Sequence, residues 1–236
     1  MTTLPAGFTL GLMHARELAL LDAWVLREGW NPGLNDLAIA YAADPEAFIA
    51  LREGDELAGA GTIFRHGPGF GFMGLFIMRP DLRGRGLGSV LWKWRRDALL
   101  ARLAPGSTVG MDGVFDMVPF YGRGGFRFAH RSLRHEGLAR APVPGAAEAP
   151  GIVPLASVST ADVLAFDRAH FPCPRATFLL PWLGQAGGTG RALLDANGEL
   201  TALGLARPCR AGFKFGPVFA RDPAGASKIL TSLLAA

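Results

Sequence analysis

Residues 70–100 read FGFMGLFIMRPDLRGRGLGSVLWKWRRDALL, and this stretch decides the fold. Its pattern predicts a buried apolar strand, a turn made by Arg83-Gly84-Arg85-Gly86-Leu87-Gly88, and an amphipathic helix that starts at about Ser89. Three glycines at alternate positions let the backbone pass close to a ligand and point successive N–H groups the same way. The positive end of the helix dipole faces the same spot. The stretch therefore predicts an anion cradle suited to a pyrophosphate.

Two common phosphate-binding motifs do not match this turn. The dinucleotide fingerprint needs G-x-G-x-x-G and an acidic residue about 20 positions later. Here the glycines are spaced G-x-G-x-G, and the helix that follows is basic. The Walker P-loop needs Gly-Lys-Ser/Thr, a tripeptide that the chain lacks. A tight strand–helix turn that binds nothing is the structural alternative.

The turn resembles motif A of the GCN5-related N-acetyltransferases (GNATs), [Q/R]-x-x-G-x-[G/A], at Arg83, Gly86 and Gly88. Residues 118–126, VPFYGRGGF, resemble the family's motif B, a short helix that carries a tyrosine and ends in Gly-Phe. The resemblance is good over about residues 8–136 and loose beyond them. It implies that acyl-CoA binds at motif A, and that Tyr121 lies near the thiol of CoA. A packed aromatic ring with a satisfied hydroxyl is the alternative interpretation of Tyr121.

The composition is that of a globular protein. Half of the 236 residues are hydrophobic and 19% are charged, so the chain can hold one large domain or two small ones. The N-terminal residues lack the basic segment and cleavage site of a signal peptide, and no apolar run reaches the roughly 18 residues of a membrane helix. Cys173 and Cys209 form neither a metal-binding spacing nor a disulfide framework. We therefore expect a cytoplasmic protein with no metal and no membrane partner.

Positive charge is concentrated around the glycine turn. The net charge is +4 at pH 7, and residues 79–102 hold seven Arg or Lys against two Asp. A basic patch can bind nucleic acid, but aromatic residues are not interleaved here as they are in sheets that stack bases. We therefore expect no nucleic-acid partner. Several negative charges on a small ligand such as CoA suit this patch better.

The pattern of apolar residues predicts a first unit with the order β-α-α-β-β-β-α-β-α-β. The predicted strands are residues 8–10, 48–52, 57–65, 70–78, 107–114 and 126–136. The predicted helices are residues 13–27, 36–43 and 89–103, and a short helix around Tyr121 with Asp116 as its N-cap. The resemblance implies the GNAT fold, an α/β (α+β) architecture. Its mixed, mostly antiparallel sheet is flanked by helices and splays where acyl-CoA enters.

A second unit follows a Pro- and Ala-rich stretch, LARAPVPGAAEAPG. We predict an acetyltransferase domain over residues 1–137, a linker over 138–151, and a partial, degenerate GNAT-like domain over 152–236. Its predicted strands are residues 152–155, 191–195, 200–207 and 213–219, and its predicted helices are 160–170, capped by Thr160, and 225–234.

The second unit differs from the first where the glycine turn would stand. Its counterpart, RDPAGA at residues 221–226, has one glycine, and Pro223 removes a donor N–H. We therefore expect this half not to bind CoA. The layout resembles bacterial two-part acetyltransferases of the YitH/HolE type, as do EGWNPG at residues 28–33 and FGPV at residues 215–218.

The resemblance assigns a role to each candidate residue. The pyrophosphate of CoA would bind Arg83, Gly84, Arg85, Gly86, Gly88 and Ser89. The pantetheine would run along the backbone of Phe76, Ile77 and Met78, with an N–H near Ile77 as the oxyanion donor. Tyr121 would protonate the departing thiolate.

The general base and the acceptor pocket are less defined. The strand over residues 70–78 lacks the glutamate of many family members, and Val114 stands where the family often has asparagine. Base candidates are Glu28, Asp36, Asp112 and His66, the last expected to be exposed; a chain of waters is an equal alternative. Candidates for the acceptor wall are Trp24, Trp30, Phe171, Phe178 and Trp182, with polar contacts from Asp167, His170 and Arg175, although packing would also explain these residues.

The sequence predicts an acetyl-CoA-dependent N-acetyltransferase that acts on a small-molecule amine. The alternative is a non-catalytic acyl-CoA-binding or regulatory protein that keeps the fold. The missing strand glutamate and Val114 favour the alternative slightly, and Tyr121 favours the enzyme. The acceptor, the length of the acyl chain and the formation of a homodimer are left open.

Overall fold

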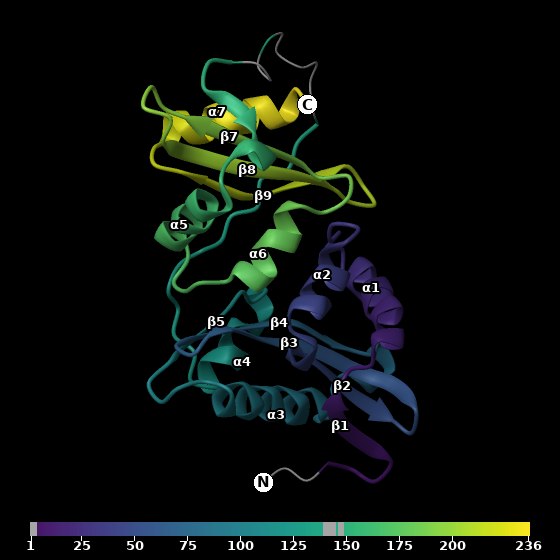
Figure 1. Cartoon of the computed structure of the whole chain (residues 1–236). Helices are drawn as coiled ribbons and strands as arrows, with labels where there is room; N and C mark the ends of the chain where they lie inside the picture. The colour runs from purple at the N-terminus through teal and green to yellow at the C-terminus, as the bar shows by residue number, and fades with distance from the viewer. Residues whose placement is uncertain (1–3, 139–144, 146–148) are drawn as a thin grey trace.

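The computed structural model of the protein describes residues 4–138, 145 and 149–236. Two sheets, one in each half of the chain, lie one above the other in Figure 1. The first contains strands from residues 8–111 and the second contains strands from residues 152–220. Most of the predicted linker, residues 138–151, lies outside the described residues, so the domain boundaries stay a prediction.

The first half contains five strands and four α-helices within the described residues. The strands are β1 (Phe8–Leu12), β2 (Phe48–Glu53), β3 (Glu56–Gly67), β4 (Phe70–Met78) and β5 (Thr108–Met111), in that order across the sheet. The helices are α1 (Leu18–Arg27), α2 (Asp36–Ala43), α3 (Leu87–Ala101) and α4 (Val118–Arg123).

The helices cover both faces of the first sheet. One core joins Leu51 and Ile63 of the sheet to Leu91 and Leu99 of α3. On the opposite face, a second core joins Phe48 to the α1 residues Leu21, Trp24 and Val25. Because β2 and β3 are buried on both faces, they consist of nearly continuous apolar residues rather than alternating ones.

The sheet opens between β4 and β5. All neighbouring strands are antiparallel except these two, which are parallel and joined through α3. Pairing runs from Phe70↔Thr108 to Met73↔Met111 and then stops. The second half of β4, from Gly74 onward, therefore has no strand on its β5 side. The predicted mixed, mostly antiparallel sheet that splays is confirmed.

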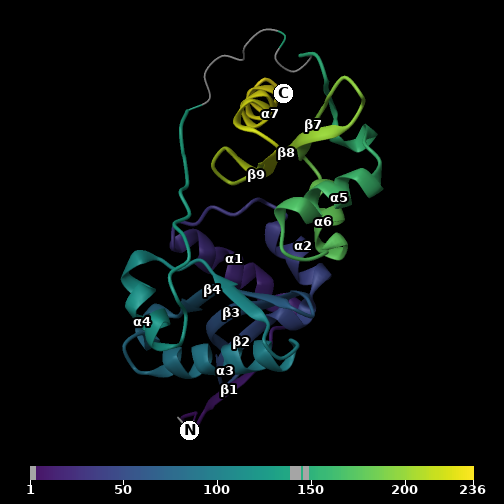
Figure 2. The ribbon, with the colours of Figure 1, turned by 90° about the vertical axis from the view of Figure 1, so that its left-hand side faces the viewer.

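The second half contains an antiparallel four-stranded sheet and three α-helices within the described residues. These elements are β6 (Ile152–Pro154), β7 (Thr189–Leu194), β8 (Leu200–Pro208), β9 (Phe213–Ala220), α5 (Thr160–His170), α6 (Ala176–Leu183) and α7 (Pro223–Leu234). Helix α7 covers one face, and α5 and α6 lie on the other, toward the first half (Figure 2). Helix α6 packs against α2 of the first half.

Three local predictions are wrong. Residues 126–136 form no strand and are largely exposed: Ser132 donates to Asp112, just beyond β5, but the backbone of this segment pairs with no strand. Asp116 does not cap α4: it lies in a short 3-10 turn, and Met117 is the N-cap, with Pro119 fixing the first helical turn. Ser159, rather than Thr160, caps α5, by accepting a hydrogen bond from the Asp162 N–H at 3.1 Å.

Candidate active site

A cavity of about 710 Å³ lies where β4 separates from β5. Five segments line it: the glycine turn, the second half of β4, the end of β5, the region of α4, and the loop over residues 28–35 between α1 and α2. The candidate residues that line it are Phe76, Ile77, Met78, Arg83, Gly84, Gly86, Gly88, Ser89 and Tyr121. Arg85 is exposed on the turn and is not part of the lining.

The glycine turn presents its backbone to this cavity. Gly84 and Gly86 have φ of +74° and +82°, in the left-handed region that favours glycine, and a Cβ at either position would meet no atom within 4 Å. Gly86 is the N-cap of α3, which therefore begins two residues before the predicted start. No side chain caps this helix end and its first turn holds no acidic residue. The first N–H groups of α3 are therefore available to an anion.

The corresponding end of α7 differs. The Asp222 carboxylate accepts a hydrogen bond from the Gly225 N–H at 2.7 Å, and Pro223 supplies no N–H. A negative side chain thus already occupies the positive end of this helix.

A β-bulge lies on the open edge of β4. The register slips between Ala60↔Ile77 and Thr62↔Gly74, so that Leu75 and Phe76 together face Gly61. Leu75 has a φ of +46°, which is uncommon for a residue with a side chain. A bulge bends its strand and redirects local backbone groups. Beyond it, no β5 residue takes up the backbone groups on the open edge of β4.

Tyr121 is buried in α4, with 8% of its surface exposed. Its ring lies 5.6 Å from the Phe120 ring, and a Cβ on Gly113 would be 2.9 Å from the tyrosine ring. Burial raises the pKa of the Tyr121 phenol, and the charge of Arg95 opposes that rise. The hydroxyl therefore holds its proton near neutral pH, as a proton donor must.

Arg83 connects three of the lining segments. Its Nε donates to the Met78 carbonyl at 3.0 Å, and its guanidinium forms an ion pair with Glu28 in the α1–α2 loop. The turn, the end of β4 and the loop are thereby held together by one side chain.

Two of the four base candidates line the cavity. They are Glu28, which is paired with Arg83, and Asp112, whose carboxylate accepts a hydrogen bond from the Ser132 hydroxyl at 3.2 Å. Asp36 is not in the lining and forms an ion pair with Arg207 at 2.8 Å.

His66 also lies away from the cavity, and its predicted exposure is wrong. Its ring packs against Phe64 and Phe70 of its own half and against Phe171 and Phe178 of the other. Burial, with the nearby charge of Arg175, lowers the pKa of His66 to about 4.

Among the eight candidates for the acceptor wall, Trp30 lines the cavity and the others do not. Trp24 belongs to the core under α1. Phe171 and Phe178 pack on His66, Trp182 packs on Arg207, Asp167 pairs with Arg175 at 2.6 Å, and His170 stacks on Phe219. Packing and contact between the halves account for these seven residues.

Most of the apolar lining and one charged residue were not predicted. Met73, Met111 and Met117 line the cavity with Leu75 and Phe120, beside Met78, which was predicted for its backbone alone. The chain has six methionines, so this concentration of flexible apolar side chains was a usable signal. Arg95, counted only as part of a basic helix, also belongs to the lining.

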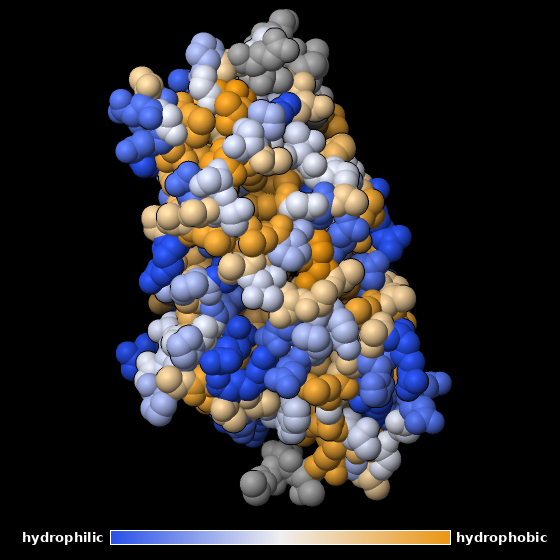
Figure 3. All heavy atoms as spheres, in the orientation of Figure 1, coloured by the Kyte–Doolittle hydropathy of each residue, from blue (hydrophilic) through white to orange (hydrophobic). Residues whose placement is uncertain are grey.

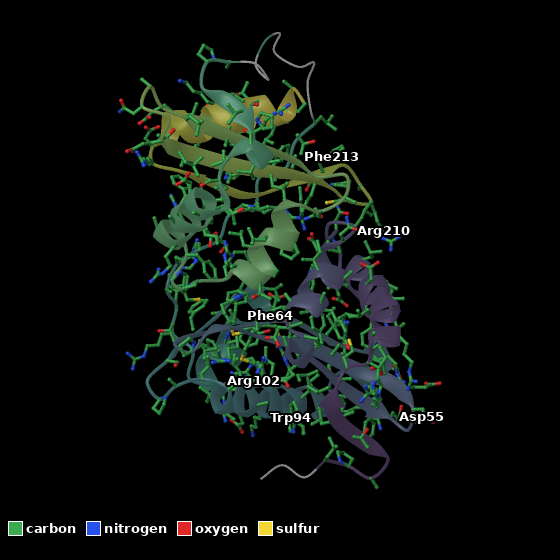
Figure 4. The ribbon with its side chains drawn as sticks, in the orientation of Figure 1. Asp55, Phe64, Trp94, Arg102, Arg210 and Phe213 are labelled. Carbon is green, nitrogen blue, oxygen red and sulfur yellow. The ribbon has the colours of Figure 1, made fainter. Side chains whose placement is uncertain are left out.

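The second half holds the α1–α2 loop in place. Arg207 binds Asp36 with two hydrogen bonds, of 2.8 and 3.1 Å, and Lys214 donates to the Trp30 carbonyl at 2.9 Å. The side chain of Asn31 donates to the Ala211 carbonyl at 2.9 Å. We call these contacts the loop clamp. Figure 4 shows Arg210 and Phe213, from the same hairpin, near the ends of α1 and α2. On the face seen in Figure 3, hydrophobic atoms lie at the level where the two halves meet.

The described residues contain neither a cluster of metal ligands nor a membrane-spanning helix. No group of three or more His, Cys, Asp or Glu side chains in this part of the chain could hold a metal ion. No helix in the same part is both long and apolar enough to cross a membrane.

Three known proteins are similar to this chain in sequence or structure over most of its length. A curated relative, holothin acyltransferase from Pseudoalteromonas sp. (strain SANK 73390), is 26% identical over 220 residues, which span 93% of this chain and 71% of the relative. A candidate acetyltransferase from Pyrococcus horikoshii has a TM-score of 0.79 at 18% identity, over 98% of this chain and 78% of its own. A GCN5-related N-acetyltransferase from Sphaerobacter thermophilus has a TM-score of 0.59 at 17% identity, over 99% of this chain and 83% of its own.

Two family models match separate halves of the chain. The model for the acetyltransferase (GNAT) family matches residues 15–126, which contain both motifs and most of the cavity lining. A second model, for an acetyltransferase (GNAT) domain, matches residues 163–236. With the splayed sheet and the glycine turn before α3, these matches show that the chain belongs to the GCN5-related N-acetyltransferase superfamily, a family of acyltransferases.

Proposed function

We propose that this protein transfers the acetyl group of acetyl-CoA to the amine of a small molecule. One observation carries the proposal: a single cavity is lined by the glycine turn at the start of α3, by the open edge of β4 and by Tyr121. These are a site for phosphate, a backbone edge for an extended chain, and a proton donor.

The lining suits each part of CoA. The uncapped N–H groups of α3 and the open space at Gly84 and Gly86 favour the pyrophosphate. Arg83, at the cavity, and Arg85, exposed beside it, add positive charge for the phosphates. The unpaired edge over residues 76–78 offers backbone hydrogen bonds to the amide groups of pantetheine, as an added strand would.

The residues present account for acyl transfer. The amine nitrogen attacks the thioester carbon, and a backbone N–H near Ile77 stabilises the negative oxygen that forms. The C–S bond then breaks, and Tyr121 gives its proton to the departing sulfur. Glu28 and Asp112, the two carboxylates in the lining, are the candidates for taking the proton of the amine, directly or through water.

The rest of the lining points to a small and partly apolar acceptor. Trp30, Met117 and Phe120 contribute apolar surface to the cavity. The similarity to holothin acyltransferase supports acyl transfer as the reaction.

A non-catalytic acyl-CoA-binding protein is the second candidate. Strand β4 carries no carboxylate, and Glu28 is engaged by Arg83. A protein of this kind would bind acetyl-CoA and release no CoA when amines are added.

Calorimetric titration with acetyl-CoA and with dephospho-CoA tests the binding site. We expect micromolar affinity for acetyl-CoA and weaker affinity when the 3′-phosphate is absent. Gly86→Asp places a side chain and a negative charge in the cradle and should abolish binding. Gly106→Asp is the matched control, because Gly106 has a similar φ of +80° and open space at its Cβ, but lies outside the cavity lining.

Equal affinity of wild type and Gly86→Asp would exclude the glycine turn as the site. A screen of primary amines, with release of the CoA thiol as the readout, then separates the two candidates. Thiol release that depends on an amine identifies the enzyme; tight binding without any release supports the binding protein.

A further inference from the structure

Arg95 is a buried arginine on α3, beneath the cavity. Its side chain is 1% exposed, and no carboxylate among the described residues forms an ion pair with it. A charge without an opposite partner is costly to bury, because it loses its hydration and gains no Coulomb attraction in return. Such a residue calls for a functional explanation.

The guanidinium is attached to the bulge of β4. Its Nη2 donates to the carbonyls of Thr62 and Gly74, both at 2.7 Å. These residues face each other across β3 and β4 at the position where the bulge begins. The guanidinium carbon lies 5.3 Å from the centre of the Phe76 ring. Arg95 thus holds both strands at the strained residue Leu75, which has a φ of +46°.

The rest of the guanidinium has no protein partner. Its Nε and Nη1 are buried and make no hydrogen bond within the described residues. Gly61 makes the space for it, since a Cβ there would lie 2.2 Å from the guanidinium carbon. The fold therefore accommodates the charge without neutralising it.

Tyr121 lines the same cavity as Arg95. Burial raises the pKa of its phenol, and the charge of Arg95 lowers it. Burial lowers the pKa of Arg95, and the charge of an ionised Tyr121 raises it, so each group favours the charged form of the other. The other charged groups in the lining have partners of their own: Glu28 pairs with Arg83, and Asp112 accepts from Ser132. No hydrogen bond joins the Tyr121 hydroxyl to another described residue.

Resting on the proposed acyl transfer, we propose that Arg95 is a positioning residue that supplies a positive charge to the cavity that Tyr121 lines and holds the β4 bulge beside the thioester. During transfer the N–C bond forms and the C–S bond breaks. The proton of the Tyr121 hydroxyl moves to sulfur and leaves a phenolate. Arg95 stabilises that phenolate until the proton released by the amine returns to it through solvent.

The test measures the ionisation of Tyr121 directly. The chain has two tyrosines, so Tyr41→Phe leaves Tyr121 as the only one. The absorbance of tyrosinate is then followed against pH in this background. We expect Arg95→Met to move the transition to higher pH, and Arg95→Lys, which keeps the charge, to leave it close to the parent.

Arg96→Met is the matched control. Arg96 is the next residue of α3 and pairs with Asp97 on the surface, so its loss removes the same formal charge from the same helix. An unchanged transition in Arg95→Met, or an equal shift in Arg96→Met, would overturn the proposal. Near-ultraviolet circular dichroism confirms that each variant is folded.

Activity gives a second readout. With acetyl-CoA and an amine from the screen, Arg95→Met should lower kcat by roughly 10²-fold, the scale of one lost electrostatic donor. The calorimetric Kd for acetyl-CoA should change little. Unchanged kcat would overturn the proposal. If the wild type binds no acetyl-CoA, the proposed function fails, while the tyrosinate titration still shows whether Arg95 and Tyr121 are coupled.

Discussion

Loss of Arg207 should destabilise the protein more than loss of any exposed charge on the same hairpin. The guanidinium of Arg207 makes two hydrogen bonds to Asp36 and a third, of 2.9 Å, to the Gly216 carbonyl. It also lies 4.5 Å from the centre of the Trp182 ring. In Arg207→Met all of these contacts disappear, and Asp36 remains buried with the Gly33 N–H, at 2.9 Å, as its hydrogen-bond donor.

The magnitude follows from burial. The side chains of Arg207 and Asp36 are 9% and 13% exposed, so solvent screens their attraction only weakly. Removal of one partner from such a pair costs about 3–5 kcal/mol, largely because the other charge is left without compensation. We expect about 3 kcal/mol for Arg207→Met, the lower end of this range, since Asp36 keeps one hydrogen bond.

Urea denaturation measures the free energy of unfolding, and a double-mutant cycle isolates the pair. In Arg207→Met/Asp36→Asn no charge is left unpaired, so the double variant should be about 2 kcal/mol more stable than the sum of the single changes predicts. Arg210→Met is the control. Arg210 pairs with Asp22 across the same interface, but its side chain is 57% exposed, so its loss should cost no more than about 1 kcal/mol.

Equal losses in Arg207→Met and Arg210→Met would refute the reasoning. Additive losses of stability in the Arg207/Asp36 double-mutant cycle would also refute it, because additivity would mean that the two buried charges do not attract each other. Arg207→Met should also raise KM for the amine more than KM for acetyl-CoA. The loop clamp holds Trp30 of the proposed amine pocket, whereas the glycine turn is attached to α3.

Three further outcomes are expected. Tyr121→Phe should lower turnover by roughly 10²-fold with little change in the affinity for CoA; turnover at the wild-type rate would remove Tyr121 from the mechanism. Stability should fall on acidification, because the pKa of His66 in the folded protein, about 4, lies below its ordinary value of 6.5. The neutral ring is therefore favoured by folding. His66 contributes about 3 kcal/mol to the free energy of unfolding above pH 6.5, and this contribution is lost as the pH falls toward 4. In urea titrations, His66→Phe should make the free energy of unfolding depend less on pH. An unchanged dependence would contradict the assignment. Gly124→Ala should destabilise the protein by about 1–3 kcal/mol, because the new Cβ would lie 2.0 Å from the buried Trp92 ring. Gly122→Ala, which meets nothing within 4 Å, should not lower the melting temperature.

The parts of the fold that depend on local chemistry could be predicted from the sequence. The apolar run of β4 and the alternating glycines before α3 require a buried strand and a close backbone turn, whatever surrounds them. The short helix with Tyr121 was also predicted. The mixed sheet and its splay came from the family resemblance, because pairing between distant segments leaves no periodic signal.

The features that could not be predicted from the sequence depend on tertiary contacts. Residues 126–136 were predicted as a strand, and Ser132 contacts Asp112 just beyond β5, yet their backbone pairs with no strand. Helix α6 has Pro181 in its interior, a residue that normally argues against a helix, and it forms because its apolar face packs on the second sheet and on α2. In the sequence, Arg95 is one of several charged residues of a basic helix. Its burial depends on Gly61, whose missing side chain makes the space on a different strand.

The loop clamp also has a consequence for biosynthesis. Asn31 and its partner Ala211 are 180 residues apart in the sequence, and Lys214 reaches Trp30 over 184 residues. A ribosome adds about 5–20 residues per second, so roughly ten seconds or more pass between synthesis of the loop and synthesis of the hairpin that holds it. During that interval the glycine turn, β4 and Tyr121 are synthesised, so every residue that lines the cavity is made before the hairpin. Under the proposed function, the nascent chain therefore contains its residues for acyl-CoA before the contacts that hold the Trp30 wall can form.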